Sequence, residues 1–309
     1  MKPLISVVLI TYNRPNYLKE CINSILSQTF KQFELFILDN GSDFSTKDII
    51  NQFSDKRIKY IRNKINSKNF INKGFEFTKN KYLMITHDDD LMEKDFLKIQ
   101  LSYLEKDDSL DLAASSISLI NSKGENLKKI RPRILTNKIW KKKQFINDYL
   151  FKGDIVPCPT CIFRSKFIFD YNLKYNEKVG PAADLYLLFK INLLNSKIFL
   201  NKSPLYKYRI HKNQDSYKNK IEMEYKIRPF IIDLLNENKE LRLRRKYESA
   251  SNGIILNTLF EGLITKKYSI SFFLENFSIL RRDCDLKLNK YSIYWSIIGI
   301  VRGYKNLLV

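Results

Sequence analysis

The sequence has few cysteines, only two histidines and no long hydrophobic run. Four cysteines in 309 residues are too few for the disulfide framework of a small secreted domain. No stretch approaches the roughly 20 apolar residues of a membrane-spanning helix. The N-terminal apolar run Leu4–Ile10 is too short for a signal peptide. These absences predict a cytoplasmic protein and leave attachment to the inner face of a membrane open.

Neither common glycine-rich phosphate cradle is present. No G-x-G-x-x-G follows the first apolar run, and no P-loop motif occurs among the nine glycines. Nicotinamide-dependent redox chemistry and P-loop phosphoryl transfer therefore lack their phosphate-binding element. The pair Cys158 and Cys161 has no second pair nearby, so we interpret it as two buried small residues rather than a zinc or redox site.

The positive charge is unevenly distributed. The chain has 54 Lys and Arg against 33 Asp and Glu, a net charge of +21. Residues 1–120 carry 17 basic and 16 acidic side chains, whereas residues 121–309 carry 37 and 17. This asymmetry indicates that the second half meets an anionic partner. Nucleic acid is one alternative, but the basic residues do not gather with aromatic residues in an RNA- or DNA-binding module, so we expect none.

Apolar patterning predicts an α/β fold with a mostly parallel sheet in the first 120 residues. Continuous apolar runs predict buried strands, and amphipathic segments between them predict helices. The expected strands are Leu4–Ile10, Phe33–Leu38, Ile58–Ile61 and Tyr82–Thr86, and the expected helices are Pro15–Ser27, Thr46–Phe53, Lys68–Thr78 and Glu93–Leu104. This alternation is typical of βαβ units.

The pattern changes after residue 120. Leu110–Ile120 and Asn126–Ile134 predict an antiparallel hairpin. Further elements are expected near Lys142–Phe151 (helix), Thr160–Phe163 (strand), Ala183–Asn195 (helix), Lys197–Leu200 (strand) and Leu205–Ile210 (strand). From about Lys220 the pattern is helical. We therefore expect one α/β domain over residues 1–218, with halves 1–120 and 121–218, and a helical region over residues 219–309.

Three polar segments follow predicted strands, at the edge where ligands bind in an open parallel sheet. They are Thr11–Arg14, Asp39–Asp43 and His87–Asp90. The consecutive carboxylates of Asp88–Asp90 repel one another and are costly to bury unpaired. Mg²⁺ or Mn²⁺ would resolve this conflict, because these ions prefer carboxylate and phosphate oxygens. The alternative is an acidic cap for the helix at Glu93–Leu104, but the neighbouring polar edges favour a metal.

Five segments, in this order, carry a resemblance to a known family. They are Ile5–Arg14, Leu38–Ser42, Tyr82–Asp90, Gly180–Leu187, and Tyr208–His211 with Ser216. Each resembles a segment of glycosyltransferase family 2, inverting nucleotide-sugar transferases of bacterial surface-glycan synthesis. The resemblance covers residues 4–216. It implies the GT-A fold, a Rossmann-like mostly parallel sheet flanked by helices, here with an all-helical C-terminal extension.

The resemblance also implies roles for individual residues. The nucleotide-binding set would be Thr11, Tyr12, Asn13, Arg14, Asp39, Asn72 and Asp88, with Asp39 accepting a hydrogen bond from the base. Asp88, Asp89 and His211 would surround the metal, which bridges the donor diphosphate, and Asp184 would be the general base. Two positions depart from the family pattern: Ile71 stands where many members carry Arg, and Ala183 stands where an acid commonly precedes the base.

The function predicted from this resemblance is metal-dependent, inverting transfer of a sugar from a nucleotide diphosphate donor to a hydroxyl of a glycan or lipid-linked acceptor. The donor is expected to be a UDP-sugar and the pathway cell-surface polysaccharide synthesis. Residues 1–120 would bind the donor and residues 121–218 the acceptor. A non-catalytic nucleotide-sugar- or glycan-binding relative is the alternative, against which the retained Asp88–Asp90 and Asp184 argue.

The C-terminal segment Tyr291–Val309 suggests where the anionic partner binds. Its aromatic and aliphatic residues are bordered by Lys290, Arg302 and Lys305, which suits a helix lying in an anionic membrane interface. Packing against the rest of the chain or against a second subunit of a homo-oligomer is the alternative.

Overall fold

The computed structural model describes residues 2–152, 156–212, 214, 220–283, 293–294, 296–298 and 300. Its contacts group the chain into two compact units. The first comprises residues 1–145, 154–178 and 191–214, and the second comprises residues 146–153, 179–190 and 215–309. Two internal segments, 146–153 and 179–190, thus group with the C-terminal residues. The functional division expected at residue 218 stays a prediction, and Ser216 and most of Tyr291–Val309 lie outside the described residues.

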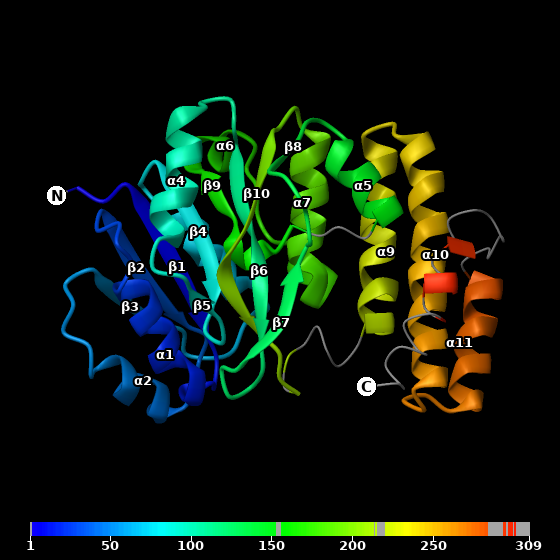
Figure 1. Cartoon of the computed structure of the whole chain (residues 1–309), viewed down its shortest axis with the longest axis horizontal. Coiled ribbons are helices and arrows are strands. Elements are labelled where there is room, and N and C mark those ends of the chain that lie inside the picture. The colour runs from blue at the N-terminus through cyan, green and yellow to red at the C-terminus, as the bar shows by residue number, and fades with distance from the viewer. Residues whose placement is uncertain are drawn as a thin grey trace. The chain divides into compact units, whose positions relative to one another are not determined.

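A ten-stranded mixed sheet forms the first unit. Its strands are β1 (Ile5–Thr11), β2 (Phe33–Asp39), β3 (Ile58–Arg62), β4 (Tyr82–His87), β5 (Leu91–Met92), β6 (Leu112–Ile120), β7 (Asn126–Arg131), β8 (Lys138–Trp140), β9 (Ile162–Arg164) and β10 (Ile198–Arg209). The order is β3-β2-β1-β4-β9-β6-β10-β5, with β7 added to β6 and β8 to β10. Figure 1 shows the blue strands β1 to β3 at one side of the sheet and the green strands β6 and β10 toward the other.

The parallel half of the sheet confirms the prediction from apolar runs. Strands β3, β2, β1 and β4 are neighbours and run parallel. Every residue of β2 is buried, and β1 is buried except for the half-buried Ile10, as expected for strands covered on both faces. The connecting helices are α1 (Pro15–Leu26), α2 (Phe44–Ile50), η1 (Lys68–Asn72), α3 (Lys73–Phe77) and α4 (Phe96–Lys106).

The helix α4 begins at Phe96 rather than Glu93, and its N-cap is Asp95. The short strand β5 lies between Asp88–Asp90 and this helix. The acidic segment therefore does not cap α4, and the alternative explanation of these carboxylates is wrong.

The other half of the sheet is mixed, with β10 parallel to β6, and it differs from expectation at β10. The two strand segments predicted at residues 197–200 and 205–210 form one strand, whose pairing with β6 is irregular between Asn201 and Tyr206. Near its end, β10 pairs antiparallel with β5, with Tyr206 opposite Met92. This pairing brings the end of β10 beside the turn that follows β4. The β6–β7 hairpin is confirmed, and β9 runs antiparallel to both β4 and β6.

The described secondary structure of the second unit consists of helices joined by short turns. Its main helices are α9 (Lys220–Glu237), α10 (Leu241–Ile264) and α11 (Ile270–Asp283), joined by most of α5 (Gln144–Lys152), η3 (Glu177–Ala182) and α7 (Ala183–Leu193). Ile221, Ile255, Leu256, Leu259 and Leu280 form one of its apolar clusters. The remaining short helices of the chain are η2 (Cys158–Thr160) and α6 (Ser165–Asp170). None of the described helices combines the length and hydropathy needed to cross a membrane.

Candidate active site

The turns after β1, β2 and β4 meet at one edge of the sheet. Thr11 lies opposite Asp39 in the register of β1 and β2, and Ile10 lies opposite His87 in that of β1 and β4. The N–H of Asn40 donates to the carbonyl oxygen of Thr11 over 2.9 Å. Residues that are 28 to 77 positions apart in the sequence therefore become neighbours because their strands are parallel and end together.

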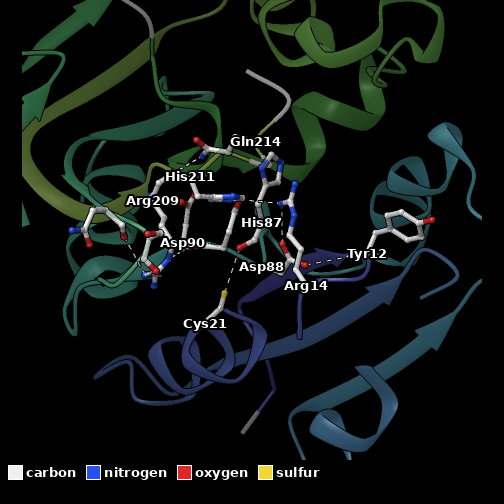
Figure 2. Close-up of polar contacts among 12 residues, drawn as sticks. Tyr12, Arg14, Cys21, His87, Asp88, Asp90, Arg209, His211 and Gln214 are labelled. Atoms are coloured by element: carbon white, nitrogen blue, oxygen red, sulfur yellow. Dashed lines mark hydrogen bonds and ion pairs between the residues drawn. The ribbon is translucent and has the colours of Figure 1, made fainter. Parts of the chain in front are cut away.

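Four of the predicted site residues form one contact cluster at this edge (Figure 2). The guanidinium Nη1 of Arg14 lies 3.2 Å from Asp88 Oδ1 and 2.9 Å from Asp89 Oδ2. The same Asp89 oxygen lies 2.9 Å from Nε2 of His211. Asp88 and Asp89 are 2% and 3% exposed. The predicted metal-binding residues thus adjoin one another, and Arg14 contacts the carboxylates.

Burial and nearby charges shift the pKa values of the two carboxylates in this cluster in opposite directions. Burial raises the pKa of Asp88, although the positive charge of Arg14 opposes this effect. Burial also acts to raise the pKa of Asp89, but Arg14, His87 and His211 outweigh it and hold that pKa below its ordinary value. The surroundings of Asp89 therefore favour its charged form.

Asp90 has a different role from its two neighbours. Its Oδ1 accepts a hydrogen bond from the backbone N–H of Arg209 over 2.9 Å. Burial raises its pKa well above the ordinary value, and the charge of Asp89 adds to the effect. Asp90 thus connects the turn after β4 with the end of β10.

Arg209 lies beside this cluster, and no role was predicted for it from the sequence. Its Nε donates to the carbonyl oxygen of Asp89 over 2.8 Å, and its Nη2 lies 2.7 Å from Oε2 of Glu20. The guanidinium carbon lies 4.7 Å from the ring centroid of Tyr17, whose ring is also 5.1 Å from that of His211. Arg209 thereby holds the backbone that carries Asp89. The segment Tyr208–His211 contains it, but the sequence did not show which atoms it would reach.

Asp39 is completely buried in the neighbouring turn. Its Oδ1 accepts the backbone N–H of Ser42 over 2.8 Å, and its Oδ2 accepts the hydroxyl of Tyr60 over 2.7 Å. Nε of Arg62 lies 3.5 Å from the same Oδ2. Burial and then the Asp39 carboxylate raise the pKa of Tyr60, so the phenol stays protonated and donates. A contact between Asp39 and a nucleotide base stays a prediction.

The other predicted nucleotide-binding residues fall into two groups. Thr11 is buried, whereas Tyr12 is 43% exposed and its N–H lies 3.4 Å from Asp88 Oδ2. Asn13 adopts a left-handed backbone with φ 49° and bonds the turn after β2 through Ser42 and Asp43. Asn72 is the last residue of η1, and its amide exchanges hydrogen bonds of 2.9 and 3.0 Å with the backbone of Tyr175. Their roles toward a nucleotide stay predictions.

The predicted base Asp184 belongs to the second unit. It lies in the first turn of α7, and its Oδ1 accepts the N–H of Leu185 over 2.7 Å. Burial raises the pKa of the nearby Tyr149, and the charges of Glu224 and Asp184 raise it further. The CxxC cysteines are both buried, and Cys158 lies on η2 with Sγ 3.8 Å from the hydroxyl of Tyr175.

At the edge where β1, β2 and β4 end, the side chains of Asp88, Asp89 and His211 are of the types that bind divalent cations. Carboxylates are ligands that Mn²⁺ and Mg²⁺ prefer, and an oxygen of Asp88 and one of Asp89 converge on a single point, with the His211 imidazole beside Asp89. A nitrogen of Arg14 occupies that point. Accordingly, the part of the chain that the structure describes contains no ready arrangement of three or more His, Cys, Asp and Glu side chains for a metal.

Comparison with known proteins identifies the family. A profile described as glycosyl transferase family 2 matches residues 6–171, more than half of the chain. The chain belongs to this family. An uncharacterized glycosyltransferase of Methanocaldococcus jannaschii, MJ1057, is 34% identical over 229 residues, which cover 72% of this chain and 76% of that protein. The chain is therefore a glycosyltransferase, as the sequence motifs predicted.

Solved structures confirm the GT-A fold. Residues 1–349 of S. aureus TarS in complex with UDP-GlcNAc superpose with a TM-score of 0.64 and 18% identity, over 100% of this chain and 92% of that one. The mannosyltransferase PcManGT from Pyrobaculum calidifontis, in complex with GDP-Man and Mn²⁺, gives 0.58 and 13% over 100% and 88%. The mixed sheet with flanking helices and C-terminal helices is thus the GT-A architecture with a helical extension.

Proposed function

We propose that this glycosyltransferase is metal-dependent and inverting, and that it transfers a sugar from a UDP-sugar to a hydroxyl of a glycan or lipid-linked acceptor in cell-surface polysaccharide synthesis. The observation that carries the proposal is the buried pair Asp88 and Asp89 beside His211, at the edge where β1, β2 and β4 end. The UDP-GlcNAc bound to TarS and the Mn²⁺ bound to PcManGT support the choice of ligands.

On the donor side, the chain's task is to bind and orient the diphosphate. Asp89 and His211 would hold the metal, and Asp88 would hold the metal and the ribose. A divalent cation there supplies positive charge where the bridging oxygen of the leaving diphosphate becomes negative. The turns carrying Thr11–Arg14 and Asp39 would bind the nucleoside, and Arg209 keeps the Asp89 backbone in place.

On the acceptor side, Asp184 is proposed as the general base. It would accept the proton of the acceptor hydroxyl while that oxygen forms a bond to the anomeric carbon. The bond from the anomeric carbon to the diphosphate breaks on the opposite face, so the anomeric configuration inverts and the nucleoside diphosphate leaves. General-base assistance of this kind contributes about 10²–10⁴ in rate.

A thermal-shift screen of UDP-, GDP- and dTDP-sugars, each with Mn²⁺ and with EDTA, tests the donor and the metal. A ligand that binds the folded state raises the unfolding temperature by mass action. We expect a UDP-sugar to give the largest shift, and only with Mn²⁺. Asp89→Asn, which keeps the side-chain volume, should lose the Mn²⁺-dependent part. Equal shifts in Mn²⁺ and EDTA would exclude a metal-dependent donor site.

The helical unit is proposed to hold the enzyme at an anionic membrane surface, where a lipid-linked acceptor is found. On α11, Ile270, Leu274 and Phe277 follow the i, i+4, i+7 spacing of one helix face and are 68%, 59% and 36% exposed. Basic residues stand at both ends, with Lys266 and Lys267 before α11 and Arg281 and Arg282 in its last turn. Exposed apolar residues bordered by cations suit a membrane interface.

A further inference from the structure

We propose that Arg14 is an internal counter-cation: it takes the place of the divalent metal while the site is empty, and it moves to the donor diphosphate when the metal binds. This inference rests on the proposed function, since its ligand is a metal with a nucleoside diphosphate. It assigns to Arg14 a role in coupling the two ligands, beyond lining a nucleoside pocket.

The first observation is that one nitrogen serves both carboxylates. Nη1 of Arg14 lies 3.2 Å from Asp88 Oδ1 and 2.9 Å from Asp89 Oδ2. The Asp89 oxygen also lies 2.9 Å from His211 Nε2, so Arg14 and His211 share this one atom. A metal held by both carboxylates would take the position between Asp88 Oδ1 and Asp89 Oδ2 that the Arg14 nitrogen fills. The guanidinium and the metal therefore compete for one position.

The second observation concerns which group is able to move. The side chains of Asp88 and Asp89 are 2% and 4% exposed, whereas that of Arg14 is 28% exposed. The backbone that carries the carboxylates is held in place, because Arg209 donates a hydrogen bond to the carbonyl oxygen of Asp89. Arg14 is the residue that precedes α1, and several rotatable bonds separate its backbone from its charge. When a metal enters, Arg14 is the group that leaves.

Electrostatics favour the replacement of Arg14 by a metal more strongly when the metal binds together with a diphosphate. Two buried carboxylates without a cation would be costly, and Arg14 removes that cost in the empty enzyme. A metal that binds alone replaces an existing ion pair, so its net gain is small. A metal that arrives with a diphosphate gives the displaced guanidinium a new anion, to which it can make paired hydrogen bonds. Metal and nucleotide should therefore bind cooperatively, and Arg14 carries the coupling.

The test compares Arg14→Gln with wild type in two binding measurements on the full chain. Mn²⁺ alone is titrated by electron paramagnetic resonance of the free ion, and UDP is titrated by calorimetry in saturating Mn²⁺. Removal of the competing charge should tighten Mn²⁺ binding about tenfold, within the usual range of coupling energies. Loss of the phosphate partner should weaken UDP binding by about the same factor. General damage to the site would weaken both.

Two further variants make the result specific. Arg14→Lys keeps the charge and should retain most of the competition, so its affinity for Mn²⁺ alone stays near wild type. Lys59→Gln removes one positive charge from the same unit at a distant ion pair, 2.5 Å from Glu34, and should change neither affinity. Thermal unfolding in EDTA shows whether each variant is folded.

The outcomes separate the inference from the proposed function. If Arg14→Gln binds Mn²⁺ as wild type does, or more weakly, Arg14 does not compete with the metal and the inference is overturned. In that case, Mn²⁺-dependent UDP binding by wild type would still support the proposed function. If wild type binds no Mn²⁺ with or without UDP, the metal-dependent function is wrong, and the inference falls with it.

Discussion

Arg209 is 1% exposed, yet its guanidinium bonds a backbone carbonyl, a carboxylate and the face of an aromatic ring. Its own backbone N–H binds Asp90, so a single residue fixes two of the three acidic positions. Asp89 can present a charged oxygen to a ligand because Arg209 satisfies the peptide that carries it. At this scale, the proposed metal site depends on residues that would not touch the metal.

Arg209→Lys tests this positioning role. Lysine keeps the positive charge but loses the planar group that reaches Asp89 and Glu20 together. Loss of an outer partner of a ligand typically costs about 10–100-fold in metal affinity or activity, and we expect a loss of this size in Mn²⁺ titration. The control is Glu20→Gln, because the Glu20 side chain is 54% exposed and can be replaced by water. An equal loss in both variants would contradict the prediction.

Asp184→Asn tests the proposed base. The amide keeps the shape of the side chain but accepts no proton, so kcat should fall by about 10²–10⁴ while the affinity for the donor stays unchanged. Steady-state kinetics and donor titration make the comparison. Glu222→Gln is the control, since Glu222 is an exposed partner of Lys226 in the same unit. A near-normal kcat for Asp184→Asn would place the base elsewhere, with Asp170 and Glu177 the next to examine.

At the scale of the elements, the site residues come together because they follow the ends of neighbouring strands. Strands β1, β2 and β4 end together, so their following turns share one edge, and the pairing of β10 with β5 delivers Arg209 and His211 to it. The turn after β2 contains Gly41, which has φ +83°. An added Cβ there would lie 2.8 Å from the carbonyl carbon of Ile65, in a neighbouring segment of the same chain. Glycine is required there for both reasons.

Gly41→Ala should therefore destabilise the first unit more than a comparable glycine substitution. Gly124 has nearly the same φ of +85°, but the nearest atom to an added Cβ is 3.5 Å away. We expect Gly124→Ala to cost about 1 kcal/mol for its left-handed backbone and Gly41→Ala roughly 3 kcal/mol, since backbone strain adds to the clash. Urea unfolding of both variants measures this. Equal costs would show that the turn can move away from Ile65.

In the helical unit, α9 carries a buried carboxylate, Glu224, whose Oε1 lies 3.5 Å from the hydroxyl of Tyr247. Burial raises the pKa of Glu224, although Ser251 and Arg228 oppose the effect. The folded state therefore holds this proton at a pH where the unfolded chain has released it. As the pH rises from the unfolded pKa to the folded one, this group makes the protein progressively less stable.

Glu224→Gln should remove that pH dependence. The stability of the variant relative to wild type is expected to increase as the pH rises above about 4.5, and to become constant above the folded pKa. Urea unfolding at several pH values between 4 and 8 tests this. Glu222→Gln, on the exposed side of the same helix, controls for the loss of a charge. A difference for Glu224→Gln that does not change with pH would show that the carboxyl ionises normally.

At the scale of the whole molecule, charge and chemistry are divided along the chain. Residues 1–120, which contain Arg14, Asp88 and Asp89, are nearly neutral, whereas the remaining residues hold almost all of the net charge of +21. The exposed apolar face of α11 lies in this basic part. Such a division suits an enzyme that binds a soluble donor with one part and attaches to an anionic surface with the other.

Sedimentation with vesicles tests the attachment. We expect the full chain to bind phosphatidylglycerol-containing vesicles at low salt and to be released at high salt, because salt screens the charges. It should not bind neutral vesicles. Leu274→Glu should weaken binding by removing apolar contact, whereas Ser271→Glu adds the same charge to the same helix without that loss. The absence of wild-type protein from the anionic pellet at low salt would contradict the proposal.

Many features of this protein depend on residues that are close together in the sequence, and those were predictable. A continuous apolar run marks a strand covered on both faces wherever it lies in the sheet, so β1, β2 and β4 could be located in advance. The three consecutive carboxylates after β4 and the segments of glycosyl transferase family 2 are also local. They indicated the fold, the reaction class and the candidate ligands Asp88, Asp89 and His211.

Only the tertiary structure decided which atoms meet. Arg14 and Asp88 are 74 positions apart, and Glu20 and Arg209 are 189 apart, yet both pairs are in contact. Segments 146–153 and 179–190, with the predicted base Asp184, group with the C-terminal helices rather than with the sheet. Contacts of this kind depend on strand order and on the register of β10 against β5, which arise from packing of the whole chain, and no local pattern encodes them.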